Sequence, residues 1–412
     1  MRRRRLLQAA LAGGALGVVG SAVGGPASAR YAFAGTGYTG DTVVVLSLRG
    51  GFDGLSAVVP KGDPAYYRWR PTIGVPRGAL LAVDAMWGLH PRLAPLWPLW
   101  QQGKLAAVHA VGQADPTRSH FEAMAELERA APGTSIRSGW LDRTLGLRSR
   151  ASVFQAVQLG STQVPASLYG SSPELAMSAI DDVELSGAGD RLPGSFTQAL
   201  TALHAGTSPS VAAPAGAALG AVATTTALKA AGYTPSGAAV YPDTGLGRAL
   251  KDVVRLVKAR VGLQVACIDY GDWDMHADLG TLAGGRMVDH LDELASALAA
   301  FATDLGPSLG GVTLVTLSEF GRRVEENGSA GTDHGHGNAV LLLGGGVVGG
   351  KVHGRWPGLA PDRLVDGDLA GLVDYRLLLG EILQKRCGLG SLSGVFPGLR
   401  GSPLGVVRAR TT

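Results

Sequence analysis

The runs VTLVTL, at residues 312–317, and GTDHGHG, at residues 331–337, decide the fold that this sequence predicts. The first run is continuously apolar apart from its threonines, as in a strand buried on both faces of a parallel sheet. The second places a carboxylate, Asp333, beside two imidazoles, His334 and His336. Its glycines let the backbone bend so that adjacent side chains can reach one ion. The pattern predicts a metal-binding loop that follows a buried strand.

The same arrangement occurs at two earlier places in the chain. DWDMH, at residues 272–276, follows the apolar run 263–268, and RGGFDG, at residues 49–54, follows the apolar run 42–48. Ligands in open α/β sheets bind at the carboxyl ends of the strands. We therefore expect the three polar segments to form one pocket at one edge of a sheet, and we expect this pocket to hold divalent metal.

Asp272 and His276 have the spacing D-x-x-x-H, which can close on one ion from a loop at a strand end. Asp274 is either a further ligand or a partner that fixes the imidazole. The alternative is an Asx-turn with a surface histidine. Trp273 indicates partial burial, and partial burial makes an unpaired charge costly.

Two other residues of the pocket remain open to more than one interpretation. Asp53 could bind a second metal ion from the neighbouring strand, or it could only cap a turn. Arg49 could hold an anionic substrate or pair with Asp53. His336 is either a ligand or only a hydrogen-bonding group.

Ser119 lies near the start of a helix expected over residues 121–131. Helix N-terminal amides and the guanidinium of Arg118 could hold an oxyanion there, and Ser119 would then be a nucleophile activated by metal coordination. The alternative is purely structural: Thr117 or Ser119 caps the helix, and Glu122 completes a capping box.

Residues 1–29 have the features of a secretory signal. Four consecutive arginines precede a weakly apolar, Ala- and Gly-rich segment, and ASA at residues 27–29 fits a cleavage site. The arginines favour the twin-arginine route, so the expected partner is the twin-arginine translocase and the expected location is the periplasm or the cell exterior. A membrane anchor is the alternative, but the glycines argue against a stable span after cleavage.

The charge balance gives no evidence for nucleic-acid binding. The formal net charge of +4 arises from 37 basic and 33 acidic residues, and residues 1–29 contain four arginines and no acid. The expected mature chain is therefore about neutral. Its two cysteines, Cys267 and Cys387, form no cysteine-rich metal motif, so any metal would depend on Asp and His.

Apolar strands alternate with helical segments through the chain, which predicts an α/β fold with a largely parallel sheet in a three-layer α/β/α sandwich. We expect one domain over residues 30–412. Within it, residues 205–245 are rich in Ala, Gly, Ser, Thr and Pro and are expected to be loosely ordered, with at most one helix near residues 212–231.

Taken together, the motifs resemble an exported bacterial family called domain of unknown function 1501. The resemblance covers nearly the whole mature chain and depends on the order of its motifs: RGGFDGL at 49–55, TRSHF at 117–121, DWDMH at 272–276, SEFGR at 318–322 and GTDHG at 331–335. That family looks related to the alkaline phosphatase and sulfatase superfamily. The resemblance therefore implies an alkaline phosphatase-like fold.

The resemblance also implies a two-metal site and an ester hydrolase. One ion would take Asp272, His276 and a late histidine, either His336 or His353. The other would take Asp53, Asp333, His334 and the nucleophile, for which Ser119 is the best match. The implied cofactors are two divalent ions, either zinc or calcium, magnesium or manganese. The implied substrate is a phosphate or sulfate ester, free or carried by a polymer; the alternative is a non-catalytic relative that binds a ligand or a surface partner.

Overall fold

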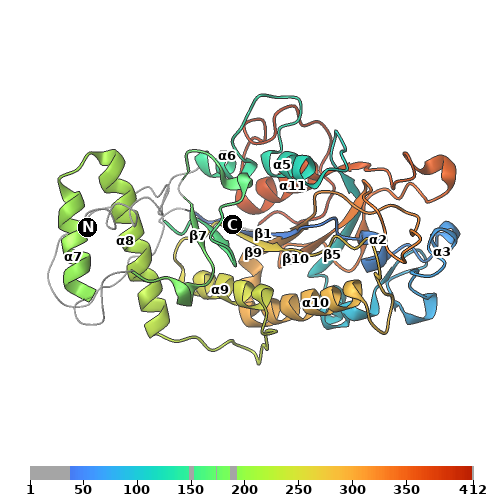
Figure 1. Ribbon diagram of the computed structural model, residues 1–412, viewed down its shortest axis with the longest axis horizontal. Coiled ribbons are helices and arrows are strands. Elements are labelled where there is room, and N and C mark those ends of the chain that lie inside the picture. Colours follow the sequence, from blue (N-terminus) through green and yellow to red (C-terminus); the bar gives the residue numbers. More distant parts are fainter. Residues whose placement is uncertain (1–37, 148–152, 173, 186–192, 411–412) are drawn as a thin grey trace.

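The computed structural model describes residues 38–147, 153–172, 174–185 and 193–410 (Figure 1). The expected signal at residues 1–29 lies outside these residues. The described chain is built around a nine-stranded mixed sheet with the order β11-β5-β10-β9-β1-β8-β6-β7, and β12 also pairs with β5. The strands of this sheet are β1 (Thr42–Leu48), β5 (Leu105–Gly112), β6 (Ala156–Leu159), β7 (Leu175–Met177), β8 (Val265–Tyr270), β9 (Val312–Leu317), β10 (Asn338–Gly344), β11 (Val352–His353) and β12 (Val373–Asp374).

The sheet is largely parallel, as the apolar runs predict. Strand β1 lies at its centre and pairs in parallel with β8 on one side and β9 on the other. Strand β10 is the exception, because it runs antiparallel to both β5 and β9. Every residue of β9 and β10 is buried, which explains why these strands read as unbroken apolar runs.

Helices cover both faces of the sheet, which gives the three layers seen in Figure 1. On one face lie α5 (His120–Arg129), α6 (Trp140–Gly146) and α11 (Tyr375–Cys387); on the other lie α9 (Gly245–Ala259) and α10 (Arg286–Leu305). Successive side chains of a strand point to opposite faces. Accordingly Val43 and Val45 join the core under α11, whereas Val44 and Leu46 join the core under α9 and α10. The predicted α/β class is confirmed.

Shorter elements complete the domain. A three-stranded sheet contains β2 (Val58–Val59), β3 (Leu81–Ala82) and β4 (Gly88–Leu89). The short α-helices are α2 (Gly54–Ala57), α3 (Pro64–Trp69) and α4 (Trp97–Gln101), and the 3-10 helices are η1 (Arg77–Ala79), η2 (Pro91–Leu96), η3 (Ala166–Leu168), η4 (Ile180–Asp182), η5 (Gly306–Gly311) and η6 (Pro361–Arg363).

Residues 205–245, expected to be loosely ordered, contain the 22-residue helix α8 (Pro209–Ala230). It packs beside α7 (Pro193–Ala205), and the pair stands at one end of the molecule, away from the sheet (Figure 1). Alanine has the highest helix propensity, which explains a helix in a segment with little apolar periodicity. Within the described residues, no helix combines the length and the apolar character that a membrane span requires.

The carboxyl ends of β1, β8 and β9 lie at one edge of the sheet, and their loops pack tightly together. Gly50, which follows β1, has φ +114, and a Cβ built there would lie 2.6 Å from the backbone nitrogen of Asp274. The Trp273 N–H donates to the Arg49 carbonyl at 3.2 Å. Only glycine satisfies both the backbone angle and the close approach at position 50.

Candidate metal centre

Three imidazoles and one carboxylate converge at this edge of the sheet. His120 is the first residue of α5, Asp274 and His276 follow β8, and His334 lies in the loop between β9 and β10. The Nε2 atom of His334 lies 3.0 Å from Nε2 of His120 and 3.0 Å from Nε2 of His276. The same atom lies 3.1 Å from Oδ1 of Asp274. His334 is therefore the central residue of the cluster.

Within the described residues, His120, Asp274 and His334 form a group that could hold a metal ion. One ligand atom from each lies within 4.8 Å of the other two. His276 joins from one side, because its Nε2 is 3.0 Å from Oδ1 of Asp274. Imidazole nitrogen and carboxylate oxygen are ligands that bind zinc and other divalent transition metals. The donor set therefore fits such an ion.

The second nitrogen of each imidazole is held by a group that can only accept a hydrogen bond. Nδ1 of His120 lies 2.7 Å from Oε1 of Glu319, and Nδ1 of His276 lies 2.8 Å from Oδ1 of Asp333. Nδ1 of His334 lies 2.8 Å from the Arg118 carbonyl oxygen. Carboxylates and carbonyls accept, so each Nδ1 carries the proton and each Nε2 presents a lone pair to the centre. Metal-bound histidines commonly have this arrangement.

A positive charge is needed at the centre of the cluster. Two neutral imidazoles that face each other with Nε2 lone pairs at 3.0 Å repel, and this applies to both contacts of His334. Protons relieve such contacts as well, because an imidazolium donates its Nε2–H to a neighbouring Nε2 or to the Asp274 carboxylate. A bound cation would relieve both contacts at once. The geometry therefore fits a bound cation at the centre of the cluster.

Arg322 holds the Asp274 carboxylate of the cluster in place. Its side chain is fully buried, and its Nη2 atom donates to Oδ1 of Asp274 at 2.6 Å. Partial burial would raise the pKa of Asp274, but the hydrogen bond and charge of Arg322 lower it to about 2. Asp274 is therefore ionised over the physiological range. Arg322 also donates to the carbonyl oxygens of Gly51, Thr332, Gly50 and Trp273, so one guanidinium joins all three loops.

Among the sequence-predicted ligands, the structure brings His276 and His334 into the cluster and places Asp333 behind His276. Asp272 does not join them. Its φ of 65 interrupts the extended segment, its side chain is exposed, and its carbonyl oxygen accepts from Arg286. Trp273 is buried in the core, and the next residue, Asp274, contributes its carboxylate to the cluster. The Asp274 carboxylate therefore lies beside the imidazoles of His276 and His334.

Asp53 does not reach this cluster either. Its carboxylate is buried and receives two hydrogen bonds from Arg70, at 2.5 and 3.0 Å, and one from Ser56 at 2.6 Å. Burial would raise the pKa of Asp53, but the charge of Arg70 outweighs burial and lowers it. Asp53, which is expected to bind a second metal ion, lies in a buried ion pair with Arg70. Arg49 pairs with Glu128 and Asp269 rather than with Asp53.

Ser119 occupies the N-cap position of α5. Its Oγ accepts from the Glu122 N–H at 3.4 Å, and the Glu122 carboxylate accepts from the Thr117 hydroxyl at 2.9 Å. The capping interpretation of this segment therefore describes its geometry. Arg118 forms an ion pair of 2.7 Å with Asp368, and its guanidinium is about half exposed.

The two late histidines lie outside the cluster. Nε2 of His336 donates to the Gln113 carbonyl at 3.1 Å, and burial lowers the pKa of His336. Nε2 of His353 donates to the Val348 carbonyl at 2.7 Å, and burial lowers the pKa of His353 as well. Each donates its Nε2 proton to a carbonyl, so neither Nε2 presents a lone pair to an ion.

Sequence reasoning missed His120 and Glu319. His120 lies within the TRSHF motif, directly after the candidate nucleophile Ser119. Its position at the first residue of a helix that follows β5 was the available signal. Glu319 follows β9 and lies in the SEFGR motif, yet no spacing rule links it to a histidine 199 residues away.

Two solved structures show weak similarity to this chain. The C-terminal periplasmic domain of EcEptC from Escherichia coli, in complex with zinc, aligns over 74% of this chain and 73% of its own, with 9% identity and a TM-score of 0.33. Phosphonate monoester hydrolase of Agrobacterium radiobacter aligns over 76% and 70%, with 10% identity and a TM-score of 0.31. Comparison with curated proteins gives no significant match.

The family comparison is extensive. The family described as "Protein of unknown function (DUF1501)" matches residues 115–368, which is more than half of the chain. The matched range includes all four residues of the cluster as well as Glu319 and Asp333. The resemblance that the motifs suggest is confirmed, and the chain belongs to the DUF1501 family.

Proposed function

We propose that this protein is an exported, metal-dependent hydrolase of phosphate or sulfate esters. Its metal centre would be His120, Asp274, His276 and His334, with a single divalent ion. The observation that carries the proposal is that the Nε2 atoms of three histidines gather beside the Asp274 carboxylate. The Nδ1 atom of each ring faces a hydrogen-bond acceptor. The order of the motifs, which resembles that of the alkaline phosphatase and sulfatase superfamily, supports the reaction class.

Zinc is the ion that best suits these ligands. Zinc sites in proteins commonly combine histidine nitrogens with a carboxylate oxygen, whereas calcium and magnesium prefer oxygen ligands alone. When bound at this centre, such an ion would supply a Lewis acid that polarises a phosphoryl or sulfuryl oxygen. The two ions implied by family resemblance become one here, because Arg70 occupies the carboxylate of Asp53.

The protein's own groups would orient the reaction. Glu319, Asp333 and the Arg118 carbonyl hold the three imidazoles in one tautomer, so their lone pairs need no rearrangement when an ion binds. Arg322 keeps Asp274 ionised and in place. This preorganisation is what a Lewis-acid site requires, because it avoids reorganisation during the reaction.

Two guanidiniums beside the centre would bind the anionic part of the substrate. Arg118 and Arg323 share the buried carboxylate of Asp368, so the trio carries a net positive charge. Both guanidiniums remain partly exposed, at 48% and 37% of their side-chain surface. Guanidinium groups recognise phosphate and sulfate oxygens through paired N–H donors. An anionic ester fits this surface better than a neutral one.

Ser119 stays in the proposal as the candidate nucleophile. Its hydroxyl oxygen accepts a long hydrogen bond from the Glu122 N–H, at 3.4 Å, and Ser119 precedes His120 at the start of α5. In the proposed reaction the Ser119 oxygen attacks phosphorus or sulfur, the ester oxygen leaves with a proton, and water then releases the acid. If water attacks directly instead, Ser119 serves only as the helix cap.

Export by the twin-arginine route is part of the same proposal. It is based on the four arginines and the apolar segment of residues 1–29. This route carries folded proteins, so the ion would be acquired before export.

The runner-up is a non-catalytic protein of the same fold that binds a ligand or surface partner. The capping role of Ser119 favours it, because a nucleophile committed to a cap is poorly placed to react. Metal content and turnover separate the two proposals. We expect purified protein to hold about one zinc ion per chain and to hydrolyse p-nitrophenyl phosphate or sulfate, and we expect Asp274→Ala to abolish both. Metal-free protein that keeps its activity would overturn the hydrolase proposal, and zinc without turnover on either ester would favour the runner-up.

A further inference from the structure

Gln113, which follows β5, makes contact with three segments that build the metal centre. Its Nε2 donates to the Ala123 carbonyl of α5 at 2.8 Å and to the Glu319 carbonyl at 2.7 Å. Its own backbone carbonyl accepts from Nε2 of His336 at 3.1 Å. The side chain is 7% exposed. One buried residue therefore joins α5, the end of β9 and the loop that carries Asp333 and His334.

The orientation of this amide follows from its contacts. Both partners of Nε2 are carbonyl oxygens, which only accept, so the nitrogen must face them and Oε1 must face away. Oε1 has no hydrogen-bond partner among the described residues. An unsatisfied buried acceptor costs about 1–3 kcal/mol, so its retention calls for an explanation.

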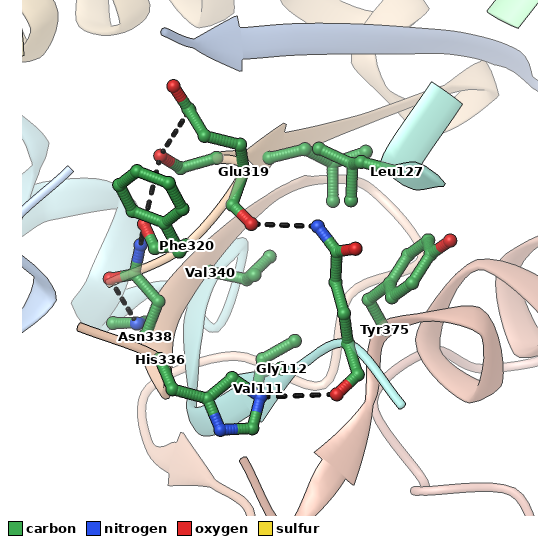
Figure 2. A pocket seen from close by; sticks show the side chains of 13 residues that line it. Val111, Gly112, Leu127, Glu319, Phe320, His336, Asn338, Val340 and Tyr375 are labelled. Carbon is green, nitrogen blue, oxygen red and sulfur yellow. Dashed lines mark hydrogen bonds between the residues drawn. The ribbon is translucent and has the colours of Figure 1, made fainter. Parts of the chain in front are cut away.

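Gln113 also lines a cavity of about 20 Å³, with Glu319, Phe320, His336 and Tyr375 among its other walls. Figure 2 shows Glu319 and His336 on opposite sides of this cavity. A space of this size holds about one water molecule. A water that donates to Oε1 would satisfy the acceptor and keep the amide in the orientation that its two donated bonds require.

The two donated hydrogen bonds join a ligand to the group that holds it. His120 begins α5, and the Ala123 carbonyl lies in the first turn of the same helix. Glu319 accepts the Nδ1 proton of His120 through its carboxylate and the Gln113 amide through its backbone. Gln113 therefore sets the distance between the helix that carries the imidazole and the loop that carries its acceptor.

We propose that Gln113 is a positioning residue for the metal centre, acting through the Glu319–His120 pair. This inference deepens the proposed function, because it depends on the same centre. The Gln113 amide keeps His120 in the Nδ1–H tautomer, so that Nε2 is available to an ion. Replacing a group that orients a metal ligand typically lowers metal affinity about 10- to 100-fold.

Gln158 of β6 provides a matched control. It is also a buried glutamine, 0% exposed, with an Oε1 that has no partner among the described residues. Its Nε2 donates to the Leu159 carbonyl, in its own strand. Substitution of either glutamine by methionine conserves volume and removes a buried amide, but only the Gln113 substitution affects groups that contact the centre.

The test measures the His120 tautomer in metal-free full-length protein and zinc affinity in loaded protein. Two-bond proton–nitrogen NMR spectra at alkaline pH report the tautomer, with His120→Gln used to assign the ring. We expect Gln113→Met to change His120 from one tautomer to a mixture and to weaken zinc binding about 10- to 100-fold. Gln158→Met should change neither. An unchanged tautomer and unchanged zinc affinity in Gln113→Met would overturn the inference.

Two further comparisons cover a Gln113→Met variant that does not fold and a wild-type protein that binds no zinc. If Gln113→Met does not fold, Gln113→Asn replaces it, because the shorter amide stays polar but cannot reach both carbonyls, and the same shift is expected. The tautomer measurement needs neither metal nor turnover. A wild-type protein without zinc or esterase activity would therefore refute the proposed function, while the comparison of Gln113→Met with Gln158→Met would still decide the positioning role.

Discussion

His276 and Asp333 lie 57 residues apart in the chain and are joined by a hydrogen bond of 2.8 Å between Nδ1 and Oδ1. The bond links the loop after β8 to the loop after β9. It also lowers the pKa of Asp333, which keeps this carboxylate ionised. The sequence predicts both residues as metal ligands. In the structure, His276 directs its Nε2 atom at the cluster, whereas the Asp333 carboxylate faces Nδ1 of His276. Asp333 contributes by holding that imidazole.

Asp333→Asn should therefore weaken the metal centre without dismantling it. An amide can present its nitrogen to Nδ1, which would favour the wrong tautomer of His276. We expect zinc affinity to fall about 10- to 100-fold, measured by competition with a chromophoric chelator. Asp362→Asn serves as the control, because that carboxylate is exposed and its ion pair is with the exposed Arg363. Equal affinities in the two variants would contradict the assignment.

Arg322→Gln should destabilise the whole fold. The buried guanidinium donates to Asp274 and to carbonyl oxygens in three loops. Loss of the guanidinium leaves several buried carbonyl oxygens without donors, and each such unsatisfied group costs about 1–3 kcal/mol. Urea unfolding followed by circular dichroism measures this loss. The exposed Arg363→Gln should change the free energy of unfolding by less than about 0.5 kcal/mol. A loss at position 322 as small as this would show that the loops hold together without the guanidinium.

Gly50→Ala should disturb Asp274 directly. A methyl group at position 50 would lie 2.6 Å from the Asp274 backbone nitrogen, on a backbone with φ +114. Alanine in such a conformation costs about 1–3 kcal/mol, and relief of the clash would shift the carboxylate, so thermal stability and zinc affinity should both fall. Gly78→Ala is the matched control, because a Cβ there meets nothing within 4 Å. Tight zinc binding by Gly50→Ala would show that the loop accommodates the methyl group elsewhere.

His109 should make the fold sensitive to acid. Burial lowers the pKa of His109 to about 4, while its Nε2 donates to the Val58 carbonyl. In the unfolded chain the His109 imidazole takes up a proton near pH 6.5. The contribution of neutral His109 to the free energy of unfolding is therefore fully present above about pH 6.5 and is lost as the pH falls toward about 4. The loss amounts to about 3 kcal/mol over that window. Burial lowers the pKa of His90 to about 4 as well, so it adds to the same slope.

The variant His109→Gln isolates one of these contributions. It should flatten the dependence of the free energy of unfolding on pH by about 1.4 kcal/mol per pH unit between the two pKa values. Denaturant titrations at a series of pH values provide the measurement. A slope that matches that of the wild type would mean that His109 takes up no proton on unfolding.

Removing the metal should lower thermal stability, because an ion that binds only the folded state stabilises it by mass action. At a free zinc concentration 100 times the dissociation constant, this amounts to about 2.7 kcal/mol. Treatment with a chelator should lower the melting temperature of the wild type and leave His334→Ala unchanged. The same shift in both proteins would place the ion outside this cluster.

The strands were predictable because their burial leaves a direct trace in the sequence. Both faces of β1 and β9 are covered by helices, so most positions in these strands are apolar and the others are threonine or serine. Helix α10 begins and ends at the residues that its apolar period indicates, Arg286–Leu305. The reversed direction of β10 left no such trace, because the same side chains are buried in either direction.

The residues of the cluster were only partly predictable, because their positions leave no pattern in the sequence. Asp272, Asp274 and Asp333 are chemically identical carboxylates in polar loops, and a backbone angle or a neighbouring arginine decides which of them faces an ion. Asp53 looked like a ligand because it follows β1. Its partner, Arg70, lies 17 residues away in a segment without a recognisable pattern.

By itself, the amino-acid sequence determined the layered α/β architecture, the edge of the sheet where polar loops gather and the membership of the family, since these depend on apolar periodicity and motif order. The tertiary structure alone decided which side chains meet. It turned His120 toward His334, placed Asp53 in a buried ion pair and set Asp333 against the imidazole of His276. The physical reason is that coordination depends on directions and distances of a few ångströms between residues far apart in the chain, which local sequence patterns do not encode.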